Sequence, residues 1–386
     1  MSSRPVFLLS RPLIACAALL PSLVACSSSD TPETLPPLTP EARAAVTVED
    51  PGAPTEELAR EIDDLFTHAD VGETRAVVIM RGGSIIAERY APGYGPDTRL
   101  ISWSMAKTVT AVMIGMLVAD GRLRLDESPP IPRWQRAGDP RGEITLRQLL
   151  QMRSGLRHTE AGDPPYESSE VRMLFLDGRD NMADWAESQP LENEPGRNFE
   201  YSSATTVILS DIAARSLTDS TDPDIRRQVV DEYLRSRIFT PLAMESMQAE
   251  YDASGTLIGG SMIHGTARDW ARFGDFLRNK GSYRGSQLVP RKWVDFMVTP
   301  SPRSPQYGAQ TWLNQPSSGE SSGKDNNPLF PARGPGSLFA AVGHLGQYVL
   351  VSPDQKLTVV RLGHSSQEQR EVLMDQLADI FAIYPG

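Results

Sequence analysis

Cysteine is almost absent from this chain of 386 residues, which contains only Cys16 and Cys26. Both lie within the first 26 residues, so the rest of the chain offers no thiol for a disulfide, a cysteine nucleophile or a thiolate metal site. Histidine is also scarce, and its five residues show no spacing typical of metal ligands. We therefore expect neither a metal nor another cofactor.

Basic residues are outnumbered, with 38 Lys and Arg against 49 Asp and Glu and a net charge of −11. An acidic chain is a poor partner for nucleic acid and for anionic lipid headgroups, so we expect a small-molecule substrate. The remaining composition, 40% hydrophobic and 23% charged, is typical of globular proteins. The length suits one domain with an inserted region, or two domains.

Beyond residues 13–23 we find no candidate membrane span, and that apolar run is itself too short to cross a bilayer. It follows Arg4 and Arg11 and ends in Leu-Val-Ala-Cys26, which resembles a bacterial lipobox. Residues 1–26 are therefore predicted to be a lipoprotein signal peptide. Lipidated Cys26 would hold the protein in the bacterial cell envelope, at the outer membrane and facing the periplasm. An ordinary signal peptide cut nearby is the alternative.

The segment after this leader, residues 27–53, is rich in Ser, Thr, Pro and Glu. This composition predicts a disordered tether, followed by a folded domain over residues 54–386. Within the domain, β-rich runs at residues 76–80 and 84–90 flank a Gly-Gly turn, and three more occur at 338–342, 347–351 and 357–362. Helical patterns lie between them and at both ends. We expect an α+β fold in which both termini build one sheet around an inserted helical region.

The motif Ser104-Met-Ala-Lys107 opens a long apolar helix. Residues three apart on a helix share a face, which places the lysine amine over the serine hydroxyl. A serine needs a base beside it to become a nucleophile, and burial can lower the pKa of a lysine enough for that role. The helix N-terminus would stabilise an oxyanion through the Ser104 N–H.

A second Ser-x-x-Lys match, Ser321 to Lys324, and a Gly-x-Ser-x-Gly match, Gly319 to Gly323, lie in a loop composition. Neither has a strand before it and a helix after it, so we interpret both as chance matches.

Five short segments, in this order, resemble the serine β-lactamase-like hydrolases, a family that includes class C β-lactamases, D-alanyl-D-alanine peptidases, carboxylesterases and 6-aminohexanoate-dimer hydrolase. They are the Ser104 motif, Leu-Leu-Gln-Met-Arg-Ser-Gly at 149–155, Pro-Gly-Arg-Asn-Phe-Glu-Tyr-Ser-Ser at 195–203, Thr-Ala-Arg-Asp at 266–269, and Gly-His-Leu-Gly-Gln at 343–347. The resemblance implies a β-lactamase/transpeptidase-like fold, with a central antiparallel sheet flanked by terminal helices and an all-helical region. It also implies a nucleophilic Ser104, Lys107 as its proton partner, and Tyr201 as a second base and acid.

Two departures from the family pattern bear on the substrate. Ser203 stands where the second motif usually has asparagine, and neither register of the third motif supplies the lysine of penicillin-recognising members. The resemblance therefore favours esters or linear amides. It also implies an oxyanion contact from the His344 N–H and substrate contacts from Tyr166, Ser203 and Gln347. The alternatives are a β-lactamase or D-Ala-D-Ala carboxypeptidase, with Arg333 as a candidate cation, and a non-catalytic binding lipoprotein.

Overall fold

The computed structural model describes residues 36–316 and 327–385. The predicted leader with Cys26 lies outside the described residues, as does the whole of Gly319 to Lys324 with both chance matches. From Leu38 onward the described chain forms one unit by its internal contacts.

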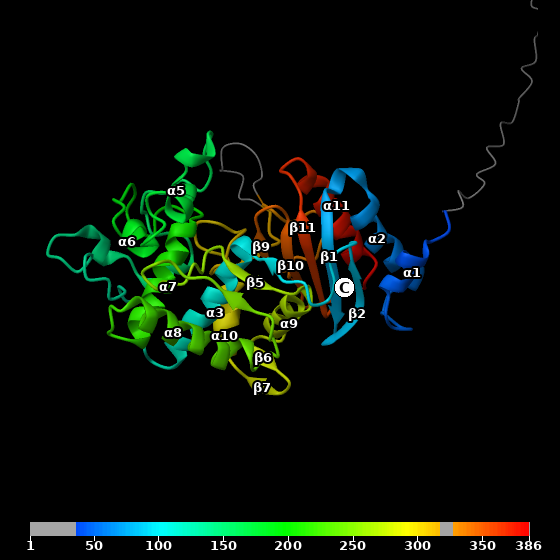
Figure 1. Ribbon diagram of the computed structural model, residues 1–386, viewed down its shortest axis with the longest axis horizontal. Coiled ribbons are helices and arrows are strands. Elements are labelled where there is room, and N and C mark those ends of the chain that lie inside the picture. Colours follow the sequence, from blue (N-terminus) through cyan, green and yellow to red (C-terminus); the bar gives the residue numbers. More distant parts are fainter. Residues whose placement is uncertain (1–35, 317–326, 386) are drawn as a thin grey trace, which may run out of the picture. The chain divides into compact units, whose positions relative to one another are not determined.

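The central sheet of this unit has six antiparallel strands among the described residues, in the order β2-β1-β11-β10-β9-β8. The first and last thirds of the chain meet where β1 pairs with β11 (Figure 1). This pairing confirms the prediction of a sheet built from both termini. The strands are β1 (Glu73–Arg81), β2 (Ser84–Tyr90), β8 (Trp312–Leu313), β9 (Phe339–Gly343), β10 (Gln347–Ser352) and β11 (Leu357–His364).

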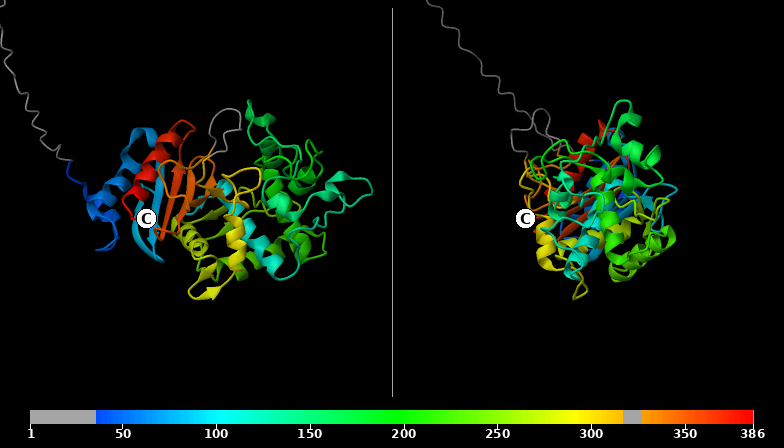
Figure 2. Two further views of the ribbon diagram at one scale, coloured as in Figure 1. Left: turned by 180° about the vertical axis from the view of Figure 1, so that it is seen from behind. Right: turned by 90° about the vertical axis from the view of Figure 1, so that its left-hand side faces the viewer.

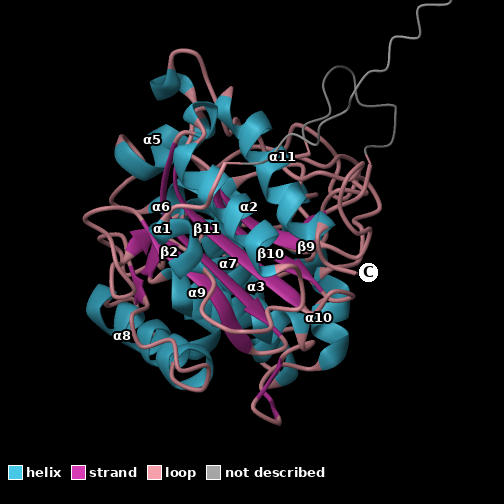
Figure 3. Cartoon of the chain, turned by 90° about the vertical axis from the view of Figure 1, so that its right-hand side faces the viewer, coloured by secondary structure: helices cyan, strands magenta, loops and turns pink. Residues whose placement is uncertain are grey.

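Side chains alternate between the two faces of the sheet, as the period of two in a strand requires. On β1, Val77 and Ile79 pack into a core with α2 (Thr55–Thr67) and α11 (Gln369–Ala382). Val78 and Met80 face a second, larger core that includes α9 (Ala267–Arg278). Helices therefore cover both faces of the sheet (Figures 1 and 3).

The larger core continues into a helical region on the α9 side of the sheet, which is also seen from behind in Figure 2. Its central helix α3 (Ala106–Ala119) is apolar around its whole circumference and is buried from residue 106 to 117. The helices around it are α4 (Leu146–Leu150), α5 (Ser169–Phe175), α6 (Met182–Glu187), α7 (Ser203–Leu217), α8 (Pro223–Leu234) and α10 (Arg291–Met297).

Short polar signals in the sequence set several helix starts. Thr145 and Gln148 form a capping box at the start of α4, and the Thr266 side chain accepts from the Asp269 N–H at the start of α9. Two small sheets complete the described chain. One contains β3 (Leu100–Ile101), β5 (Ile263–Gly265) and β4 (Gln248–Ala249), and the other contains β6 (Ser282–Tyr283) and β7 (Ser286–Gln287).

The predicted tether over residues 27–53 is wrong in its second half. Helix α1 (Pro40–Ala45) buries Ala42 and Ala45 against the domain, and the Thr47 N–H donates to the Ile86 carbonyl on β2. Small apolar residues among the polar ones are enough to cover this edge of the sheet, so the folded unit begins at Leu38. Among the described helices, none has the length and apolar character needed to cross a membrane.

Candidate active site

Ser104 lies in a 3₁₀ turn, Trp103–Met105, that leads directly into α3. Trp103 has a φ of 45°, in the left-handed region that a bulky side chain rarely adopts. Ser102 anchors the turn, because its N–H donates to the Ile263 carbonyl at 2.9 Å and its Oγ accepts from the Ile263 N–H at 3.2 Å. The strained turn leaves Ser104 partly exposed at the mouth of the helix.

The Lys107 amine is buried directly beneath Ser104, with only 1% of the residue exposed. Its Nζ lies 2.9 Å from Ser104 Oγ, 2.8 Å from Ser203 Oγ and 2.8 Å from the Gly260 carbonyl. Burial lowers the pKa of Lys107 and outweighs the opposing effect of the nearby Glu160 and Glu170 carboxylates. The neutral amine, which can accept a proton, is therefore favoured relative to an exposed lysine.

Two adjacent glycines let the chain approach the lysine closely. A Cβ at Gly259 would lie 2.4 Å from both Ser210 Oγ and Thr110 Oγ1, and one at Gly260 would lie 3.1 Å from the Ser203 carbonyl oxygen. A larger residue at Gly259 would push this turn of the chain away from α3 and α7. The pair thus explains how a main-chain carbonyl reaches the Lys107 amine.

Tyr201 precedes α7, which Ser202 caps by accepting from the Thr205 N–H. Its ring centroid lies 4.9 Å from Lys107 Nζ, and Tyr307 and Trp312 pack against the ring at 5.8 and 5.4 Å. Burial, followed by the effects of Tyr307 and Glu160, raises the pKa of Tyr201 well above its usual value, and a hydrogen bond with Ser104 only partly offsets this. The Tyr201 hydroxyl therefore stays protonated and is a proton donor.

Strand β9 runs against the Ser104 turn. A Cβ at Gly343 would lie 2.2 Å from the Ser102 carbonyl, so the two backbones touch. Within the described chain, the N–H groups of Ser104 and His344 have no hydrogen-bond acceptor. The predicted pair of oxyanion donors is therefore available, while the exposed His344 ring stands edge-on to Trp103 at 5.5 Å.

A sequence model described as Beta-lactamase matches residues 62–382 of this chain. The chain belongs to the Beta-lactamase family. This membership, together with the antiparallel sheet and the helices on both its faces, confirms the predicted resemblance and fold class.

The chain is also similar to individual hydrolases and to their solved structures. A 6-aminohexanoate-dimer hydrolase from Paenarthrobacter ureafaciens is 26% identical over 272 residues, which cover 66% of each chain, just under two thirds. A solved structure of a putative 6-aminohexanoate-dimer hydrolase from Bacillus anthracis is 23% identical with a TM-score of 0.64, and the match covers 81% of this chain and 79% of that one. A family VIII carboxylesterase structure is 14% identical with a TM-score of 0.58, covering 84% and 96%. These likenesses agree with the family membership, and the solved structures show the shared fold.

Ser203 does not face the substrate side of this Beta-lactamase family site. It is 0% exposed, and its hydroxyl contacts Lys107 Nζ, Glu160 Oε1 at 2.5 Å and Glu170 Oε1 at 3.1 Å. A fully buried hydroxyl with these partners holds the lysine rather than a substrate. Ser203 was predicted to contact the substrate, but in the structure it positions the Lys107 amine instead.

Gln347 is likewise occupied by the protein itself. Its amide nitrogen donates to the carbonyls of His344, Leu345 and Gly363, and its oxygen accepts from the Gly363 N–H. The buried Arg361 adds a 2.9 Å bond to the Gly346 carbonyl. These side chains fix the turn between β9 and β10, and so the direction of the His344 N–H, which leaves Gln347 no free donor for a substrate.

Tyr166 projects from a 3₁₀ turn, Pro165–Glu167, with 62% of the residue exposed. It stays a predicted substrate contact. Glu160 and Glu170, on either side of this turn in the sequence, were missed because no short motif marks them. Only tertiary folding brings them to Ser203 and Lys107.

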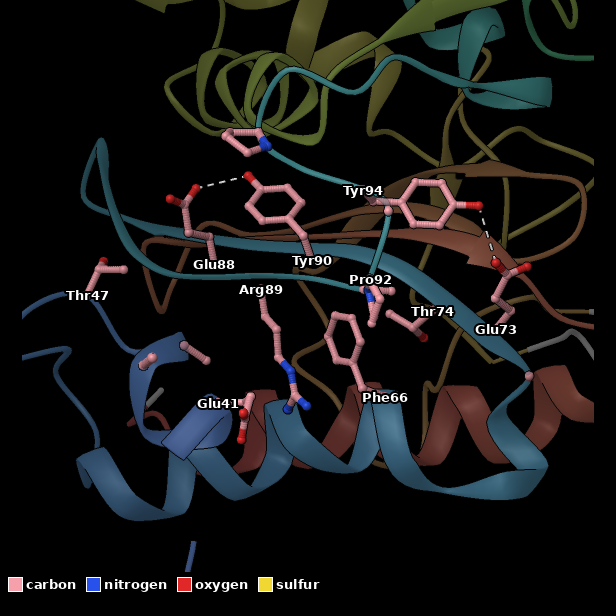
Figure 4. A pocket seen from close by; sticks show the side chains of 16 residues that line it. Glu41, Thr47, Phe66, Glu73, Thr74, Glu88, Arg89, Tyr90, Pro92 and Tyr94 are labelled. Atoms are coloured by element: carbon pink, nitrogen blue, oxygen red, sulfur yellow. Dashed lines mark hydrogen bonds between the residues drawn. The ribbon is translucent and has the colours of Figure 1, made fainter. Parts of the chain in front are cut away.

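A separate cavity of about 870 Å³ lies between α1, α2 and β2, and none of its lining residues belongs to the Ser104 cluster (Figure 4). There Arg89 stacks on Phe66 at 4.5 Å, and the Tyr90 hydroxyl donates to Glu88 at 3.0 Å. These polar side chains therefore already have partners within the protein. In the described residues, no group of three or more His, Cys, Asp or Glu side chains is arranged to hold a metal ion.

Proposed function

We propose that this protein cleaves ester or linear amide bonds through an acyl-enzyme formed on Ser104. The observation that carries the proposal is the buried Lys107 amine, with a lowered pKa, 2.9 Å from Ser104 Oγ. The similarity to a 6-aminohexanoate-dimer hydrolase and to a carboxylesterase supports this class of bond.

In acylation, the Ser104 proton passes to Lys107 Nζ as Oγ forms a bond to the carbonyl carbon. The carbonyl oxygen takes the electron pair, and the free N–H groups of Ser104 and His344 stabilise the negative charge. Preorganised donors of this kind typically contribute roughly 10²- to 10³-fold to the rate.

When the intermediate collapses, the bond from the carbonyl carbon to the leaving group breaks, and the Tyr201 hydroxyl gives that group its proton. The proton that Lys107 took up restores the tyrosine, because the high pKa of Tyr201 disfavours a lasting tyrosinate. A water molecule then attacks the acyl-enzyme with Lys107 again as base, and Ser104 recovers its proton as the acid product leaves.

Esters and linear amides are favoured over β-lactams because strand β9 offers no cation for a β-lactam carboxylate. Strand β9 carries Ala341, Val342 and Gly343 where a lysine-containing motif would lie. Arg333, the candidate replacement, is bound to Asp375 and Asp379 on α11. Its charge is thus already neutralised in the helix layer over the sheet.

The test compares the full-length protein with Ser104→Ala on three substrates: a p-nitrophenyl ester series, the linear 6-aminohexanoate dimer, and nitrocefin. Ser236→Ala, at an exposed serine that bonds only to its own helix, is the matched control. Ester or dimer hydrolysis that is lost in Ser104→Ala alone supports the proposal. Strong nitrocefin turnover would favour a β-lactamase instead. If the protein shows neither activity nor fluorophosphonate labelling, the result would favour the alternative of a non-catalytic binding protein.

The location of the protein is a separate part of the proposal, supported by the lipobox-like end of the leader at Cys26. We place the protein in the bacterial cell envelope, lipid-anchored and facing the periplasm. Metabolic labelling with an alkyne fatty acid should mark the wild-type protein and not Cys26→Ser. Equal labelling of both proteins would refute a lipid on this cysteine.

A further inference from the structure

Two carboxyl groups with no assigned role converge on the hydroxyl that holds the catalytic lysine. Ser203 Oγ donates to Glu160 Oε1 at 2.5 Å and lies 3.1 Å from Glu170 Oε1. Glu160 also accepts from the Ser203 N–H at 2.8 Å, and its Oε2 lies 2.6 Å from His158 Nε2. Glu160 is therefore held from three directions, which a freely solvated surface carboxylate is not.

The fold brings this pair together by closing a loop at its base. Thr159 and Ser169 exchange three hydrogen bonds through their hydroxyls and main-chain N–H groups, and the Glu170 N–H donates to the Thr159 carbonyl. Residues 160 and 170 thus lie side by side despite the ten positions that separate them. Both side chains then turn toward the start of α7, where Ser203 lies.

The directions of the hydrogen bonds follow from the chemistry of these groups. A carboxylate has no proton to give, so the Ser203 hydroxyl donates to Glu160 and can only accept from Lys107. The Gly260 carbonyl, 2.8 Å from Nζ, also can only accept. A neutral amine has two N–H groups and one lone pair, and these two acceptors occupy both N–H groups. The lone pair is left for the third neighbour, Ser104 Oγ, at 2.9 Å.

We propose that Glu160 is a positioning residue for acylation: it fixes the direction of the Ser203 hydroxyl and thereby aims the Lys107 lone pair at Ser104. This inference rests on the proposed function, since it concerns the step in which Lys107 takes the Ser104 proton. Glu170 is the weaker second acceptor of the same hydroxyl. No proton passes to Glu160 in this role.

Charge at the site agrees with the geometry. Burial opposes ionisation of Glu160, but the hydrogen bond from His158 and the charge of Lys107 outweigh it, so the pKa of Glu160 lies below its usual value. Glu160 is therefore an anion, and an acceptor, at neutral pH. Burial and the charge of Glu160 raise the pKa of Glu170 to about 7, so the pair carries little more than one negative charge below that pH.

Replacement by glutamine tests the direction of the bond while keeping the shape. In Glu160→Gln the new amide can present N–H groups to Ser203, whose hydroxyl could then turn and donate to the Lys107 lone pair. The lone pair would no longer face Ser104. Since general-base catalysis contributes roughly 10²- to 10⁴-fold, we expect Glu160→Gln to lose about 10- to 100-fold in acylation rate.

The experiment measures the rate of fluorophosphonate labelling of Ser104 and kcat/KM for a p-nitrophenyl ester in the full-length protein. The variants are Glu160→Gln, Glu160→Asp, Ser203→Ala and the double variant Glu160→Gln/Ser203→Ala. Glu187→Gln, which makes the same change at a buried glutamate outside the cluster, is the control. Thermal unfolding of each variant shows whether it is folded at the assay temperature.

We expect Glu160→Gln to slow labelling, Glu187→Gln to leave it unchanged, and Glu160→Asp, which keeps an acceptor, to recover part of the loss. If Glu160 acts through Ser203, the double variant will be no slower than Ser203→Ala. Additive losses, or a wild-type rate in Glu160→Gln, would overturn the inference. Should Glu160→Gln fail to fold, unimpaired labelling of Ser203→Ala would overturn it equally. A wild-type protein that neither labels nor turns over substrate would refute the proposed function instead.

Discussion

Lys107 Nζ and Ser203 Oγ lie 2.8 Å apart at the centre of the candidate active site. This contact joins helix α3 to helix α7. Through Ser203 it also connects Lys107 to the carboxyl groups of Glu160 and Glu170, which no sequence motif indicates. A lysine that is buried with three hydrogen-bonding partners has a fixed direction as well as a lowered pKa. The predictions below test the separate parts of this arrangement.

Removing the Tyr201 hydroxyl should slow cleavage most where the leaving group needs a proton. For Tyr201→Phe we expect kcat on a linear amide to fall by roughly 10²-fold or more, the size of a general-acid contribution. The loss on a p-nitrophenyl ester should be much smaller, because that leaving group departs as a stable anion. Steady-state kinetics on both substrates provide the comparison. Equal losses would mean that Tyr201 acts in proton removal rather than in donation.

Glu170→Gln should shift the pH dependence of kcat/KM to lower pH. In the wild type the pKa of Glu170 is about 7, so this carboxyl ionises as the pH rises through neutrality. Its negative charge, together with that of Glu160, opposes the lowering of the Lys107 pKa by burial. Glutamine removes this charge but keeps the shape near Ser203. We expect the limb on which activity rises with pH to lie at lower pH in the variant, because Lys107 then loses its proton at lower pH. An unchanged profile would contradict this.

Gly343→Ala should weaken the oxyanion contact without unfolding the domain. The new Cβ would lie 2.2 Å from the Ser102 carbonyl, which would force β9 and the His344 N–H away from the Ser104 turn. Loss of one oxyanion donor typically costs roughly 10²- to 10³-fold in kcat. Gly95→Ala, which meets no atom within 4 Å, is the control and should retain activity. Full activity in Gly343→Ala would show that the position of β9 does not matter for the oxyanion contact.

Glu187→Gln should stabilise the protein more at high pH than at low pH. Burial and the neighbouring Asp211 raise the pKa of Glu187 from 4.5 to about 8. A carboxyl whose pKa is raised in the folded state contributes stability below its unfolded pKa, and that stability is lost as the pH rises through the folded value. Glutamine cannot ionise and avoids the loss. Thermal unfolding at pH 5 and pH 9 should show a larger gain in Tm at pH 9, and a gain confined to pH 5 would refute the assignment.

Local signals in the sequence were reliable where the physics is local. The Thr145 and Gln148 capping box, the Thr266 cap and the Gly-Gly hairpin each depend on neighbours within a few residues. The pairing of Ser104 with Lys107 is also local, because helical geometry alone places residues three apart on one face.

Contacts between distant segments could not be predicted in this way. Glu160 meets Ser203 across 43 positions, and Lys107 meets Gly260 across 153. The motif alone suggests that Gln347 is available to a substrate, yet the fold surrounds it with carbonyl groups of its own turn and of β11. The prediction of a disordered tether was wrong for a related reason. The segment is mostly polar, and its composition gave no sign that a few alanines would pack onto the sheet.

The sequence by itself determined the family, the antiparallel sheet built from both ends, and the identity of Ser104, Lys107 and Tyr201 as candidates, because repeating apolar patterns and short motifs encode these directly. Tertiary structure alone decided the protonation and direction of those groups. Burial lowers the pKa of Lys107 and raises that of Tyr201. The direction of the lysine lone pair depends on acceptors from segments far apart in the chain, which meet only when the domain folds.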